Sequence, residues 1–96
     1  MKIVKPVNKT IVIGENSITF TDFTLQMIED ERFGKTLKAL KCAAEIVKGV
    51  LEPAESFEIS EEAYKILKEV LETPKKPYQV IVGISILPFI QALLGE

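Results

Sequence analysis

The sequence predicts an α+β domain that is mainly helical, with an N-terminal β-hairpin followed by three or four helices. Three observations lead to this prediction. Short β-branched runs near the N-terminus flank a turn, longer segments carry apolar residues at helical spacing, and glycines or prolines separate these segments. A chain of 96 residues can close one hydrophobic core. We therefore expect a single domain that covers residues 1–96.

The hairpin is predicted over about residues 9–20. The stretches Lys9–Gly14 and Ser17–Phe20 are rich in β-branched residues, and Glu15-Asn16 separates them. Gly14 can adopt the positive φ that a tight hairpin turn requires.

A short helix is expected next, over about residues 22–31. Thr21 and Asp22 offer side-chain oxygens for its N-cap, and Phe23 and Met27 follow at helical spacing. Gly34 then marks a turn after a charged run.

The segment 35–52 gives the strongest helical pattern in the sequence. Its apolar residues recur at alternating intervals of three and four: Leu37, Leu40, Ala44, Val47 and Leu51, with Ala43 and Val50 beside them. We expect this stripe to face the core, and we expect Pro53 to end the helix.

A further helix is predicted over residues 61–73. Ser60 is a suitable N-cap, and Thr73-Pro74 ends the pattern. The apolar stripe of this helix comprises Ala63, Ile66, Leu67, Val70 and Leu71. The stretches 52–57 and 73–77 are expected to be loose connections.

The last element, about residues 78–94, is ambiguous by periodicity alone. The sequence QVIVGISI has the β-branched character of a strand, whereas Ile81, Ile84 and Leu87 begin a helical stripe that continues beyond Pro88. Pro77 suits a first helical turn, and Pro88 can kink or break a helix. We expect a kinked or broken helix here, and not a membrane span, because the stretch is short and contains glutamines, a serine and a proline.

Composition restricts the possible functions. Hydrophobic residues make up 47 % of the chain, so a subunit or partner interface is expected to cover part of them. The net charge of −2 makes nucleic acid an unlikely main partner. Cys42 is the only cysteine, and lysines interrupt the apolar residues at the N-terminus, so a cytoplasmic location without export is expected.

No motif in the sequence predicts catalysis, a cofactor or a metal. Histidine is absent, which removes the commonest general base and zinc ligand. The sequence Gly34-Lys35-Thr36 resembles the end of a phosphate-binding loop, but Glu29 stands where that loop requires a glycine. The acidic run 29–31 lacks the ligand spacing of a calcium loop. We therefore predict that the protein is not an enzyme.

Two groups of residues are candidates for interaction. Lys35, Lys38, Lys41 and Lys48 are expected on the side of the long helix opposite its leucines, either as a contact for an acidic partner or simply as a solvated face. In the last element, the candidates are Phe89, Ile90, Leu93 and Leu94.

Two stretches, FTDFTLQMIEDERFGKTLKAL and SEEAYKILKEVLETP with the later ILPFIQALLG, resemble small proteins encoded in the structural-gene region of tailed phages and prophages. The similarity covers roughly residues 18–95 and rests on hydrophobic patterning with Phe20, Phe23, Phe33, Pro74, Pro88 and Phe89. It implies a tail-assembly accessory or chaperone-like role in the host cytoplasm or the virion.

The sequence therefore favours a non-enzymatic protein-interaction or assembly module that binds a protein partner or forms a homo-oligomer, and the resemblance implies a phage or prophage setting. The alternative is a small DNA-associated regulatory protein that acts as a dimer through the four lysines. A salt-sensitive shift of duplex DNA would distinguish the alternative from the first hypothesis.

Overall fold

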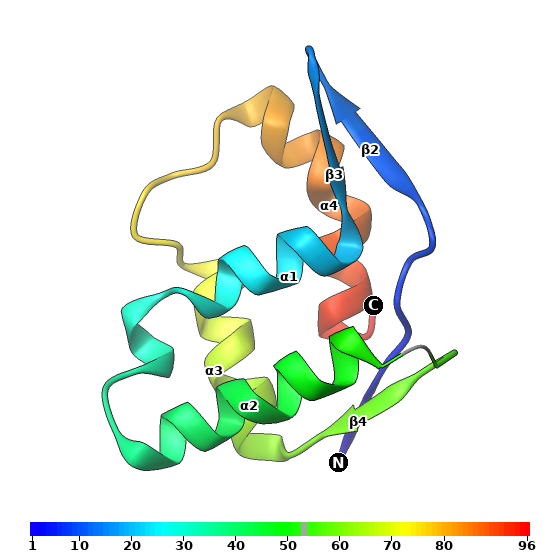
Figure 1. The fold of residues 1–96 in the computed structure, drawn as a ribbon. Coiled ribbons are helices and arrows are strands. Elements are labelled where there is room, and N and C mark those ends of the chain that lie inside the picture. The colour runs from blue at the N-terminus through cyan, green and yellow to red at the C-terminus, as the bar shows by residue number, and fades with distance from the viewer. Residues whose placement is uncertain (53) are drawn as a thin grey trace.

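The computed structural model describes residues 1–52 and 54–96, and it shows the predicted α+β fold (Figure 1). Helices dominate, and the N-terminal hairpin precedes all of them. Pro53, the predicted end of the long helix, lies outside the described residues.

The predicted hairpin is present. Strand β2 (Thr10–Ile13) pairs antiparallel with β3 (Asn16–Thr19), with Thr10 opposite Thr19 and Ile13 opposite Asn16. Gly14 lies in the turn at a φ of 62°, in the left-handed region that glycine adopts without strain.

A second antiparallel pair joins distant parts of the chain and was not predicted. Strand β1 (Lys2–Val4) pairs with β4 (Phe57–Ile59), so that Lys2 lies opposite Ile59. Val4 and Ile59 are both buried. The stretch 52–57, which was expected to be a loose connection, therefore ends at the first residue of β4. A strand of three residues is too short to show a period in the sequence.

The first helix, α1 (Phe20–Ile28), begins two residues earlier than predicted. Thr19 is its N-cap, with an extended backbone and a side-chain oxygen that accepts a hydrogen bond from the Asp22 amide at 3.1 Å. The cap is therefore the last residue of β3, and the chain passes from strand to helix without a loop. A short 3₁₀ helix, η1 (Glu31–Phe33), follows before Gly34.

The long helix α2 (Leu37–Leu51) lies within the predicted segment 35–52, beginning two residues later and ending one residue earlier, but the side that it buries was predicted wrongly. Leu37, Leu40 and Leu51 expose between 57 and 70 % of their surfaces. The buried residues are instead Ala39, Cys42, Ala43, Ile46, Gly49 and Val50. Most of these side chains are small, which allows neighbouring elements to approach the helix axis closely. At Gly49, for example, a Cβ atom would meet the Phe57 ring of β4.

The helix α3 (Glu61–Glu72) confirms its predicted N-cap, because the Ser60 Oγ accepts a hydrogen bond from the Ala63 amide at 3.2 Å. The Glu45 carboxylate of α2 accepts hydrogen bonds from the amide and the hydroxyl of Ser60 at 2.9 and 3.0 Å. Ala63, Leu67, Val70 and Leu71 are buried, as the stripe predicted.

The last element is the helix α4 (Val80–Leu94), which confirms the choice of a helix over a strand. It is not broken, because a single helix runs through Pro88, and Pro77 lies before its first turn. Proline cannot donate a hydrogen bond to the carbonyl four residues earlier, here that of Ile84. Because Pro88 and Ile84 both lie on the exposed side, water can satisfy that carbonyl.

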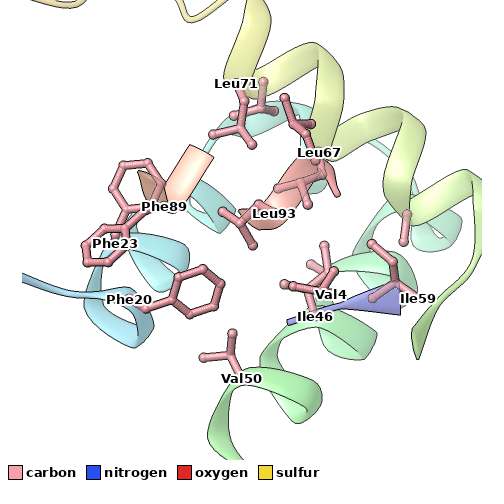
Figure 2. Close-up of a cluster of buried hydrophobic side chains, with 14 of the residues drawn as sticks. Val4, Phe20, Phe23, Ile46, Val50, Ile59, Leu67, Leu71, Phe89 and Leu93 are labelled. Carbon is pink, nitrogen blue, oxygen red and sulfur yellow. The ribbon is translucent and has the colours of Figure 1, made fainter. Parts of the chain in front are cut away.

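The core brings together side chains from all parts of the chain (Figure 2). The Phe89 ring of α4 lies 5.7 Å from the Phe20 ring, edge to face, and 5.8 Å from the Phe23 ring. Leu67, Ile46 and Leu93 fill the space between α2, α3 and α4. The last helix therefore completes the core.

Candidate functional site

The exposed apolar surface of α4 is the main candidate site, and it is not the surface that was predicted. Phe89 and Leu93 are fully buried, Leu94 is buried and Ile90 is half-buried, so the first three cannot form a contact surface. The opposite side of α4 carries Val80, Ile81, Ile84 and Leu87, which expose between 42 and 75 % of their surfaces. We call these four residues the α4 face.

Periodicity did not show which side of α4 is exposed, but another feature of the sequence indicates it. No charged residue occurs between Tyr78 and Gly95, so charge could not show which side of the helix is exposed. Pro88 and Gln91, however, both lie on the exposed side. A proline that removes a backbone hydrogen bond is best tolerated where water can replace it, and this preference could have identified the exposed side.

A second exposed apolar surface lies on α2. We call Leu37, Leu40, Ala44, Val47 and Leu51 the α2 seam. Its three leucines and Ala44 are exposed, and Val47 is half-buried. The same alternating spacing that predicted a buried stripe therefore lies at the surface.

The four lysines lie in different surroundings. All of them are exposed, and Lys38 forms an ion pair with Glu62 of α3 at 2.7 Å, which raises the pKa of Lys38 through a hydrogen bond. Lys41 and Lys48 form no ion pair with any described residue. Lys41 is one turn after Leu37 and Lys48 is one turn before Leu51, so these two lysines border the α2 seam rather than lying opposite it.

A cluster of hydrogen bonds centres on Arg32 and joins separate elements of the fold. Its guanidinium donates two hydrogen bonds of 2.9 Å to the Asp30 carboxylate, and Nη1 donates to the carbonyl of Thr73, also at 2.9 Å, beyond the end of α3. The hydrogen bonds from Arg32 to the carboxylate hold the pKa of Asp30 at about 2. Arg32 thus ties η1 to carbonyls at the C-terminus of α3.

Three observations on the described residues concern possible chemistry: the state of the Cys42 thiol, a cavity beside the hairpin and the arrangement of potential metal ligands. Burial raises the pKa of the Cys42 thiol, which disfavours the reactive thiolate. A cavity of about 680 Å³ between the hairpin and α1 is lined by Ile13, Ser17, Leu25 and the carboxylates of Asp22 and Glu29. Among the described residues, no group of three potential ligands could hold a metal ion.

Over the same described part of the chain, none of the helices is both long enough and apolar enough to cross a membrane. Comparison with protein-family models, with curated proteins and with solved structures gave no match.

Proposed function

We propose that this protein is a non-enzymatic interaction and assembly module that associates with copies of itself through the α4 face. The observation that carries the proposal is the exposure of Val80, Ile81, Ile84 and Leu87 on a helix without a charged residue. Contiguous apolar patches of this kind mark interaction surfaces in folded proteins.

A second copy is the partner that suits this face. A symmetric dimer places the same patch on both subunits, so the patch must be complementary to itself. An uncharged helix meets this condition without repulsion between like charges, whereas it offers no charged group to select a different partner.

The size of the face predicts weak association. Four partly exposed side chains present roughly 300 to 600 Å² of apolar surface, whereas a stable interface buries about 800 Å² on each partner. We therefore expect a dissociation constant in the micromolar range, not the nanomolar range.

The setting that we propose is phage or prophage assembly, supported by the sequence resemblance. A protein partner is also favoured over DNA, because the chain has a net charge of −2 and one of the four candidate lysines is already paired with Glu62. Calorimetric titration against the products of neighbouring genes tests the setting, and failure to bind any of them would argue against it.

Self-association is tested by measuring the solution mass by light scattering, from micromolar to millimolar protein. The wild type is expected to shift from monomer to dimer, and the double variant Ile81→Gln/Ile84→Gln is expected to stay monomeric. Leu37→Gln/Leu40→Gln, which removes two equally exposed apolar residues from α2, is the matched control and should dimerise like the wild type. A wild type that is monomeric throughout would refute the proposal, and so would a double variant that dimerises normally.

A further inference from the structure

The α2 seam has the spacing of one strand of a coiled coil. Leu37, Leu40, Ala44, Val47 and Leu51 follow one another at intervals of three, four, three and four, which are the a and d positions of a heptad repeat. Such positions normally insert into a facing helix. Here three leucines of the seam are largely exposed, so no helix among the described residues covers them.

The two edges of the seam differ. Within α2, one edge carries Lys41 and Lys48, seven residues apart, at equivalent heptad positions. The other edge carries Ala43 and Val50, which are buried in the domain. Charge can therefore act only on the lysine edge, where neither lysine forms an ion pair with a described residue.

This asymmetry disfavours a second copy as the occupant. An antiparallel copy would bring lysines against lysines. A parallel copy would direct them toward Ala43 and Val50, which are buried and uncharged. Neither arrangement gives Lys41 or Lys48 an acidic partner.

We propose that the α2 seam binds an amphipathic helix of another protein, with leucine-like side chains at its a and d positions and glutamate or aspartate along one edge. The seam from Leu37 to Leu51 is about 21 Å long, because an α-helix rises 1.5 Å per residue. It matches about two heptads of the partner, whose a and d side chains would pack against it as in a coiled coil. This site goes beyond self-association, because it lies on another helix and takes another occupant.

The test uses the full chain and two fluorescent peptides of about three heptads. Both peptides carry leucine at a and d, and the flanking positions are glutamate in one and lysine in the other. Binding is followed by fluorescence anisotropy, with each peptide and the protein kept below their self-association ranges. The glutamate peptide is expected to bind at least fivefold more tightly than the lysine peptide, and its affinity should fall as salt is raised.

Three variants make the test specific to the seam. Leu37→Gln/Leu40→Gln should weaken binding of the glutamate peptide at least tenfold. Lys41→Glu/Lys48→Glu should reverse the preference between the two peptides. Ile81→Gln/Ile84→Gln changes the α4 face and should leave peptide binding unchanged.

Equal binding of both peptides would overturn the proposal, and so would a leucine variant that is folded by circular dichroism but binds like the wild type. A preference that survives the lysine reversal would overturn the assignment of the charged edge. None of these results depends on whether the α4 face forms a dimer, so failure of one proposal can be distinguished from failure of the other.

Discussion

Gly49 shows how a single residue lets a neighbouring element pack closely against a helix. Glycine in a helix interior usually costs about 1 kcal/mol relative to alanine. In α2, however, a Cβ at position 49 would lie 2.2 Å from Cδ2 and 2.5 Å from Cγ of Phe57. Because Gly49 has no side chain, the Phe57 ring of β4 can pack directly against α2.

We predict that Gly49→Ala destabilises the protein by about 1 to 3 kcal/mol, the usual cost of an overpacked contact, in spite of the better helix propensity of alanine. Urea denaturation measures the change. Ala44→Gly, on the exposed side of the same helix, serves as the propensity control and should cost about 1 kcal/mol. A stabilised Gly49→Ala variant would mean that Phe57 does not pack on this position.

A second residue-scale prediction concerns Asp30. Its pKa is about 2 in the folded protein, compared with 3.8 for an unperturbed aspartate, mainly because Arg32 donates hydrogen bonds to the carboxylate. A folded pKa below the unfolded value means that the stabilisation is fully present above about pH 4. It is lost as the pH falls through the folded value.

Asp30→Asn is therefore expected to lower the free energy of unfolding by on the order of 1 to 2 kcal/mol at pH 6. The difference from the wild type should shrink between pH 4 and pH 2. Urea denaturation at a series of pH values measures it, with Glu29→Gln, an exposed neighbour, as the control. A difference that stays constant with pH would show that Arg32 and Asp30 do not interact as described.

At the scale of whole elements, one side of α4 is buried in the core and the other is exposed to solvent. Phe89 is buried against Phe20 and Phe23, whereas Ile81, two turns earlier, exposes 75 % of its surface. Both are large apolar residues of one helix, so a matched pair of truncations separates packing from surface.

Phe89→Ala is expected to lower the free energy of unfolding by about 3 to 5 kcal/mol, because it removes buried area and leaves a cavity among the rings. Ile81→Ala should change it by less than about 0.5 kcal/mol at protein concentrations where the monomer dominates. Thermal and urea unfolding provide the comparison. Similar effects of the two substitutions would contradict the assignment of the buried side.

Some features of the helices and strands could be predicted from the sequence, and others could not. The extents of α2 and α3 follow from the 3.6-residue period and from caps such as Ser60, because these signals are local. The orientation of α2 does not, since the apolar residues of that helix cover a wide arc, and the leucine stripe is the more hydrophobic part of it although the other part is buried. The pairing of β1 with β4 depends on contacts between residues far apart in the chain, which local patterns do not encode. For the candidate site, the lysines were correctly identified as exposed, but three of the four tail residues proposed as a surface, Phe89, Leu93 and Leu94, are core residues, and Ile90 is half-buried.

For the molecule as a whole, the dependence of the core on its last helix leads to a further prediction. Truncation after Leu87 removes Phe89, Leu93 and Leu94, which belong to the core cluster. The shortened protein is expected to lose its cooperative unfolding transition, because the removed burial exceeds the small net stability of a domain of this size.

Circular dichroism during heating measures this transition. Truncation after Leu94, which removes only Gly95 and Glu96, is the control and should unfold cooperatively near the wild-type temperature. Cooperative unfolding of the shorter chain would mean that residues 88–94 are dispensable for folding.

The contact of Phe89 with Phe20 and Phe23 also has a consequence for synthesis. A ribosome makes the chain from the N-terminus, so Phe20 and Phe23 leave it long before the ring that covers them exists. Strand β1 likewise cannot pair until β4 has been synthesised. The nascent chain therefore cannot complete its core until α4 has been made and has left the ribosome. Until then Phe20 and Phe23 lack the ring that covers them, and exposed apolar side chains of this kind are what chaperones bind.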